Sequence, residues 1–99
     1  YIDDLCQGII KSILNKKAFN QTFNITFGKG REINILVKIL REYFPNIKIK
    51  FKSKGKFVPK RGTLSNLKAK KLLGFKPAWK LEKGYKNYIE WYINLTSQN

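Results

Sequence analysis

The sequence predicts an α/β fold, in which two strands and a helix form a βαβ unit that further helices flank. Residues 22–27 (TFNITF) and 47–52 (IKIKFK) alternate as strands with one buried face do. Between them, apolar residues follow the helical period from about Glu32 to Phe44. A strand, a helix and a strand in this order favour parallel strands with a right-handed connection. We expect one small domain spanning residues 1–99.

The first expected helix begins at Asp3 and Asp4. Its apolar stripe consists of Leu5, Cys6, Ile9, Ile10, Ile13 and Leu14. An aspartate at this position can cap the helix or face its positive end. A metal-binding or catalytic carboxylate pair is the alternative, but consecutive residues do not share a helix face. We therefore interpret the pair as a helix start.

The turn after the first expected strand is a candidate phosphate site. Gly28-Lys29-Gly30-Arg31 would lie at the carboxyl edge of the sheet, where ligands of α/β proteins bind. Its backbone amides and two cations could contact a phosphate. Two glycines in a turn more commonly serve backbone conformation alone, and this interpretation is favoured here. The helix that follows should end at Pro45. Its expected apolar face consists of Ile33, Leu36, Val37 and Leu40, and Ile35 and Ile39 widen this face.

The C-terminal half predicts two helices after a polar loop from Lys52 to Lys60. A short helix spans Leu67 to Leu73, with Ser65 or Asn66 as its N-cap and Gly74 as its C-cap. Its expected inward side is Leu67, Ala69, Leu72, Leu73 and Phe75. A last helix runs from about Leu81 to Leu95, and residues 96–99 should fray. Its expected inner face is Leu81, Tyr85, Tyr88, Ile89 and Tyr92, with Trp91 off this stripe.

The charge balance predicts attraction to polyanions. The chain carries 21 Lys+Arg against 6 Asp+Glu, a formal net charge of +15, so non-specific binding of nucleic acid is a first hypothesis. The cations are nearly all lysine, a bias that an A/T-rich coding sequence would also produce. Arginine, which base and phosphate readers favour, stands only at Arg31, Arg41 and Arg61.

The remaining composition excludes several kinds of site. The chain has no histidine, no clustered carboxylates, no P-loop and no G-x-G-x-x-G, so we expect no catalytic, cofactor-binding or metal-binding residue in it. The lone Cys6 rules out an internal disulfide and favours a reducing, cytoplasmic location. No apolar run is long enough to predict a membrane span.

Short motifs occur along the chain in a specific order and spacing. They are Tyr1-Ile2-Asp3-Asp4-Leu5, Phe23-Asn24-Ile25 with Gly28-x-Gly30, Pro59-Lys60-Arg61-Gly62-Thr63-Leu64, Lys68-Ala69-Lys70-Lys71-Leu72-Leu73-Gly74-Phe75-Lys76-Pro77, Leu81-Glu82-Lys83-Gly84 and Tyr88-Ile89-Glu90-Trp91-Tyr92. In this order they resemble the C-terminal portion of the NAD-dependent epimerase/dehydratase family, the nucleotide-sugar epimerases among the extended short-chain dehydrogenase/reductases.

The resemblance implies both an architecture and a role. Family members begin with a Rossmann domain that carries NAD, a Ser/Thr and a Tyr-x-x-x-Lys pair, and end with a smaller domain that closes over the nucleotide sugar. Residues 1–99 would be this C-terminal substrate-binding domain, a fragment of a Rossmann-type enzyme whose NAD and catalytic groups lie upstream of Tyr1. The absence of methionine agrees, because Tyr1 cannot be a translation start. We therefore expect a piece of a longer protein, inactive alone and prone to self-association.

The resemblance assigns one residue of this chain to the substrate. Arg61 matches the arginine with which family members contact the substrate's diphosphate, and a guanidinium binds phosphate oxygens in bidentate fashion. A surface arginine on a loop is the alternative. Many relatives carry an acidic residue where this chain has Ser65, so a carboxylate contact to the sugar or to Arg61 would be missing.

Three hypotheses of function remain open. The first is the nucleotide-sugar-binding part of an NAD-dependent epimerase or dehydratase, similar to UDP-glucose 4-epimerase. The second is a free-standing basic domain that binds nucleic acid or another polyanion. The third is a truncated gene product without function.

Overall fold

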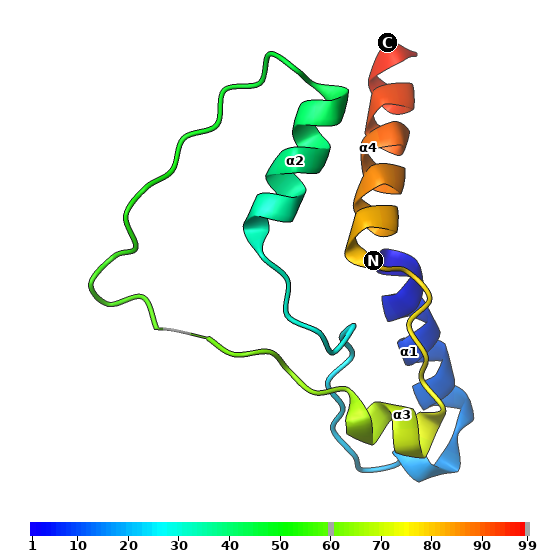
Figure 1. The fold of residues 1–99 in the computed structure, drawn as a ribbon. Coiled ribbons are helices and arrows are strands. Elements are labelled where there is room, and N and C mark those ends of the chain that lie inside the picture. The colour runs from blue at the N-terminus through cyan, green and yellow to red at the C-terminus, as the bar shows by residue number, and fades with distance from the viewer. Residues whose placement is uncertain (60, 99) are drawn as a thin grey trace.

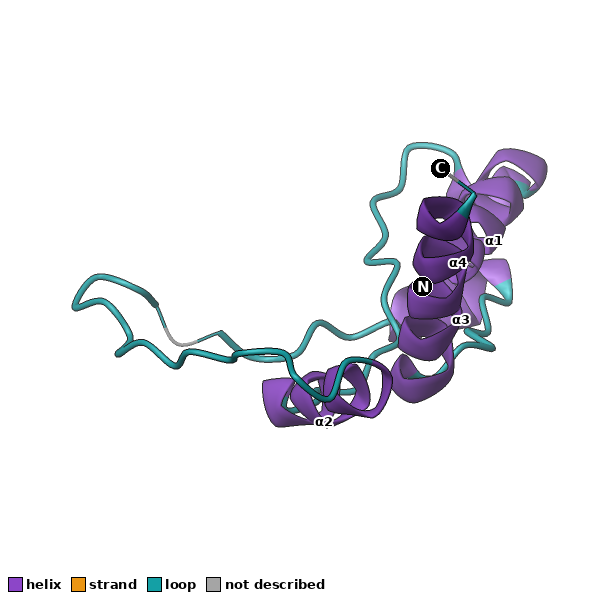
Figure 2. Ribbon diagram, turned by 90° about the horizontal axis from the view of Figure 1, so that it is seen from above, coloured by secondary structure: helices purple, strands orange, loops and turns teal. Residues whose placement is uncertain are grey.

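The computed structural model describes residues 1–59 and 61–98, and its regular structure is helical (Figure 1). The elements are α1 (Ile2–Leu14), a short 3₁₀ helix η1 (Lys16–Ala18), α2 (Ile33–Tyr43), α3 (Leu67–Leu73) and α4 (Leu81–Ser97). Helix α2 lies beside α4, and α3 packs against α1 (Figure 1). Figure 2 shows the long loop between α2 and α3 reaching outward. No helix within these residues is long and apolar enough to cross a membrane.

The predicted α/β fold with a βαβ unit is wrong, because the described residues contain no strand (Figure 2). Residues 22–27 and 47–52 run as extended loop without a neighbouring strand. Alternation indicates that one face of a segment is buried, but a strand also needs a backbone partner. In residues 22–27 helices partly bury the apolar face, since Phe23 and Ile25 pack on a cluster around α3. Residues 47–52 lie in the loop that leaves α2 (Figure 1), where Phe51 is 70% exposed.

All four predicted helices are present, with bounds close to those expected. The structure extends the last helix through Ser97, so the fraying expected at residues 96 and 97 is not observed, and residue 99 lies outside the described residues. Gly74 takes the left-handed conformation at φ 66°, which confirms it as the C-cap of α3. Asn66 occupies the N-cap position without a side-chain cap bond, whereas the Ser65 hydroxyl accepts a hydrogen bond from the Leu67 amide at 3.3 Å.

The main core lies where α1, η1 and α3 meet. Its buried residues are Ala69, Leu73 and Phe75, and the partly buried residues packed against them are Ala18, Phe23 and Ile25. Gly8 of α1 allows Ile25 to approach closely, because a Cβ at that position would lie 2.7 Å from Ile25 Cγ2. The prediction of Leu67 as an inward residue is wrong, since its side chain is exposed.

A second contact joins α2 to α4, where Ile39 and Ile89 are the buried apolar residues of the two helices. The Tyr43 hydroxyl donates to Glu90 at 2.8 Å, and this hydrogen bond raises the pKa of Tyr43. The predicted inner faces are only partly correct. Ile33 on α2, and Tyr88 and Tyr92 on α4, are exposed.

The molecule is open for its size. Its accessible surface is 8614 Å², whereas a compact monomer of this mass would expose about 5,800 Å². Its radius of gyration is 17.1 Å, against roughly 13 Å for a compact domain of this length. Much of the additional surface is apolar, and on α1 it includes Ile9, Ile10, Ile13 and Leu14.

Candidate anion-binding site

The start of α1 holds the chain segment that leads into α4. Asp4 is buried, and its two carboxylate oxygens accept hydrogen bonds from the amides of Ala78 at 2.8 Å and Trp79 at 2.9 Å. Gln7 adds two bonds to the backbone of Lys76, at 3.1 and 3.2 Å. These four bonds place Trp79, directly before α4, beside the first turn of α1.

Asp4 therefore acts as a cross-link and not as the predicted cap. The N-cap of α1 is Tyr1, without a side-chain cap bond, while Asp3 and Asp4 lie in the first turn, where the helix dipole favours them. The alternative of a metal-binding aspartate pair conflicts with the hydrogen bonds of Asp4, whose two carboxylate oxygens are both engaged by backbone amides. Across residues 1–59 and 61–98, no three His, Cys, Asp or Glu side chains are placed to hold an ion.

The turn at residues 28–31 is held by the segment that follows Arg61. The Asn66 side-chain amide donates to the carbonyls of Thr26 at 3.1 Å and Phe27 at 3.3 Å. The Thr63 side chain lies against Gly30, where a Cβ would clash with it. The turn that was considered as a candidate phosphate site and the segment after Arg61 are thus adjacent.

A cationic cleft of about 620 Å³ opens between this turn and the start of α4. Its walls are Phe27, Lys29, Arg31, Lys80, Glu82 and Lys83. Arg31 is paired with Glu82 through two hydrogen bonds, one of them from Nη1 to Oε2 at 3.1 Å. Glu82 therefore offsets the charge of Arg31 and leaves the cleft with the charge of its lysines. Among the described residues, none of these three lysines forms an ion pair.

Arg61, the predicted diphosphate contact, is exposed and is not among the residues that line this cleft. It lies two positions before Thr63, on the strip of chain that borders the turn. Lys60, from the same motif, lies outside the described residues. Arg61 is therefore not placed in the cleft, and its role stays a prediction.

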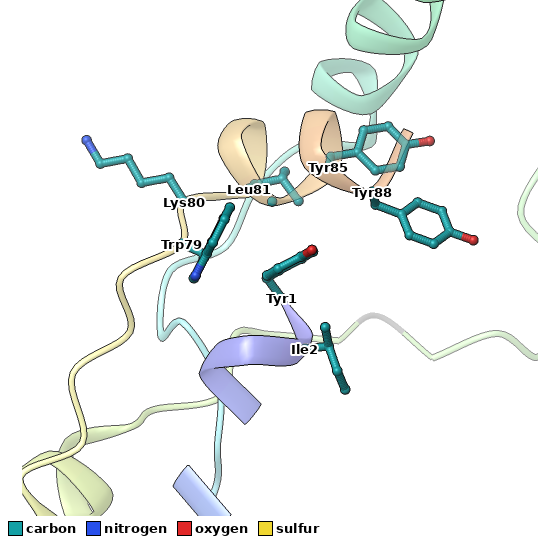
Figure 3. A pocket seen from close by; sticks show the side chains of 8 residues that line it. Tyr1, Ile2, Trp79, Lys80, Leu81, Tyr85 and Tyr88 are labelled. Carbon is teal, nitrogen blue, oxygen red and sulfur yellow. The ribbon is translucent and has the colours of Figure 1, made fainter. Parts of the chain in front are cut away.

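An aromatic cavity of about 370 Å³ adjoins the cleft, and its lining includes Tyr1, Trp79, Leu81, Tyr85 and Tyr88 (Figure 3). The rings of Tyr1 and Trp79 face each other with centroids 4.5 Å apart and planes inclined by 36°. The Lys83 ammonium lies 4.4 Å from the centre of the Trp79 ring. Asn87 donates to the Tyr1 hydroxyl, and Gly84 lies against the Tyr1 side chain.

The sequence does not predict this aromatic cavity. Its pattern places Tyr85 and Tyr88 on a core-facing stripe, and no local pattern connects Tyr1 with Trp79. A third cavity of about 290 Å³ shares Tyr1 and Trp79 with the aromatic cavity and Lys29 and Arg31 with the cleft. Apolar rings and cations therefore form one continuous surface.

Comparison with known proteins adds one relative. The chain is 31% identical over 100 residues to an uncharacterized protein of Methanocaldococcus jannaschii, in an alignment that covers 94% of this chain and 28% of the relative. The chain thus spans less than a third of the relative's length. No protein-family model matches the chain, and no solved structure matches it significantly.

Proposed function

We propose that this chain is the C-terminal, nucleotide-sugar-binding part of an NAD-dependent epimerase or dehydratase and is inactive by itself. The observation that carries the proposal is the set of family-like motifs, which occur in the family's order from Tyr1 to Tyr92. The remaining support comes from how these motifs are used in the structure.

Residues from separate motifs contact one another. Asp4 of the first motif binds the amides of Ala78 and Trp79, which follow directly on the Gly-Phe-Lys-Pro motif. Ile25 of the second packs against the cluster that contains Phe75. Gly84 of the Leu-Glu-Lys-Gly motif lies against Tyr1. These contacts join motifs that are far apart in the sequence, which supports treating the motifs involved as a unit.

The cationic cleft supports a phosphorylated ligand. Lysines 29, 80 and 83 line a cavity next to the strip that begins at Arg61. A diphosphate carries two or more negative charges, and cations around a concave site attract such a group. A nucleotide sugar would then have its diphosphate near Arg61 and the cleft.

The exposed apolar surface supports a larger assembly. The accessible surface is about half as large again as that of a compact monomer, and the apolar side of α1 is part of this exposed surface. A Rossmann domain packed on this side would bury it, and the length of the Methanocaldococcus relative is compatible with such a domain.

The proposal is tested by reading the coding sequence upstream of the Tyr1 codon and then by substituting Arg61 in the complete protein. We expect an in-frame G-x-x-G-x-x-G followed by Tyr-x-x-x-Lys. We expect Arg61→Ala to weaken UDP-sugar binding by about 10- to 100-fold, the range for loss of a charge-assisted bidentate contact. Lys70→Ala, an exposed cation on α3, is the matched control. A start codon directly before Tyr1, or equal effects of the two substitutions, would contradict the proposal.

A second candidate function, binding of nucleic acid or another polyanion, is favoured by one specific observation. Lysines stand at every second position of the loop from residue 48 to 56, which is exposed except at Ile49, beside the exposed Phe51 and Phe57. Such binding would show no sequence preference and would weaken sharply between low and physiological salt. Titration of a labelled oligonucleotide at two salt concentrations tests it, and affinity that survives high salt would favour this function over the first.

A further inference from the structure

We propose that the aromatic cavity binds the base of a nucleoside phosphate while the adjoining cleft binds its phosphate. This inference rests on the proposed function in taking the ligand to be part of a nucleotide sugar. It adds a base-binding site to the predicted diphosphate contact at Arg61.

The cavity has the size and lining that a planar aromatic group requires. Its volume of about 370 Å³ falls within the range of small-molecule sites. Tyr1, Trp79, Tyr85 and Tyr88 supply aromatic surface from both the start of α1 and the start of α4 (Figure 3). Aromatic side chains stack with any nucleobase, because every base presents a π face.

The lysines around the cavity favour a ligand that is also an anion, whereas Glu32 lines the third cavity between the two halves and opposes it. Lys80 lines both the aromatic cavity and the cleft, and Lys29 and Lys83 line the cleft. The one carboxylate in the cleft, Glu82, is paired with Arg31. The buried carboxylate of Asp4 is engaged with two backbone amides. An aromatic anion therefore meets complementary groups at both of its ends.

Lys83 connects the two halves of the site. Its ammonium lies over the Trp79 ring, an arrangement that contributes only modestly where the lysine is exposed. Lys83 is exposed and also lines the cleft, so its flexible side chain can move from the ring to a phosphate. Trp79 lines the aromatic cavity and Lys83 does not, so a base in the cavity would contact Trp79 while the ammonium turns to the phosphate.

Fluorescence titration of the chain tests this model. The sequence contains two tryptophans, so Trp91→Phe leaves Trp79 as the single indole reporter. We expect uridine monophosphate to quench Trp79, ribose 5-phosphate to compete without quenching, and uridine to bind at least tenfold more weakly than the monophosphate. We expect Lys83→Ala to weaken monophosphate binding by about three- to tenfold, as for loss of one partly exposed charge contact.

Lys68→Ala is the matched control, because Lys68 also lies over an aromatic ring, that of Phe23 at 5.2 Å, but away from the cavity. Its expected effect on affinity is less than twofold. The inference is overturned if the monophosphate leaves Trp79 unchanged, if ribose 5-phosphate quenches equally, if uridine binds as tightly, or if the two lysine variants behave alike. UDP-sugar binding that depends on Arg61 but leaves Trp79 fluorescence unchanged would overturn this inference and retain the proposed function. Base-dependent quenching without any dependence on Arg61 would retain this inference and overturn the proposed function.

Discussion

Replacing Asp4 by alanine should destabilise the fold far more than the same change at its neighbour Asp3. Asp4 is 6% exposed and accepts two backbone hydrogen bonds from a segment more than 70 positions away. Asp3 is exposed in the same helical turn. The two substitutions remove the same charge from the same end of the α1 dipole, so their difference isolates the cross-link to Ala78 and Trp79.

The expected magnitude follows from the two amides. An amide left without a partner costs about 1–3 kcal/mol when it is buried. Both bonds are only partly buried, so water can reach the freed amides and values near the lower end apply. We expect Asp4→Ala to lower the free energy of unfolding by about 2–3 kcal/mol, and Asp3→Ala by about 0.3–1 kcal/mol through the helix dipole alone. Asp4→Asn retains one acceptor oxygen, so its loss of unfolding free energy should lie between those of Asp4→Ala and Asp3→Ala.

Urea denaturation followed by circular dichroism measures these differences. For a domain of this size, 2 kcal/mol corresponds to a shift in melting temperature of roughly 8–16 °C, which thermal scans would resolve. The Trp79 fluorescence of the Trp91→Phe background should change with Asp4→Ala, because that substitution releases the backbone of Trp79. Equal destabilisation by the Asp3 and Asp4 substitutions would refute the assignment of Asp4 as the cross-link.

Three further predictions concern packing and association. Gly8→Ala places a Cβ 2.7 Å from Ile25 Cγ2 and should lower the free energy of unfolding by about 1–2 kcal/mol, even after the gain in helix propensity. Urea denaturation measures this loss, and Ile25→Ala in the same chain should remove most of it. A stabilised Gly8→Ala variant would show that the contact is absent. A Cβ at Gly74 would contact no other atom, but the residue has φ +66°, so Gly74→Ala should lower the free energy of unfolding by about 1 kcal/mol from backbone strain alone. A Cβ at Gly62 would also contact no other atom, and Gly62→Ala should leave the free energy of unfolding unchanged in the same assay. The isolated chain should self-associate and bind a hydrophobic dye because of its uncovered apolar surface, and sedimentation of a monodisperse monomer that binds no dye would contradict this.

The helices were predictable because each has its own periodicity and end signals. The span of α2 shows a stripe with the helical period, ended by Pro45, and α3 ends at a glycine that takes the left-handed conformation. Such signals are local, so they hold whatever surrounds the helix. The burial of individual residues was less predictable. Ile33 and Leu67 belong to apolar stripes but are exposed. An apolar stripe shows which side of a helix is apolar, but it does not show how much of that side a neighbouring element covers.

The site was less predictable because it joins residues that are distant in sequence. The turn at Gly28–Arg31 and the arginine motif were each recognised as possible phosphate contacts, but their adjacency depends on Asn66 and Thr63. The contact of Tyr1 with Trp79 depends in turn on the hydrogen bonds of Asp4. A carboxylate in the first turn of a helix suggests a cap, and no local pattern shows that it holds a segment more than 70 positions away.

The alternation in residues 47–52 and the exposed apolar residues of α1 share one physical cause. Alternation in residues 47–52 and the apolar stripe of α1 both indicate a surface on the other side, and within the described residues that surface is lacking. Segment 22–27 shows the opposite case, because α3 and its neighbours cover Phe23 and Ile25. An interface of standard size buries about 800 Å² on each partner, less than the roughly 2,800 Å² by which this chain exceeds a compact monomer of its mass. A partner that covers the apolar side of α1 and the apolar residues of segment 47–52 would therefore account for both features.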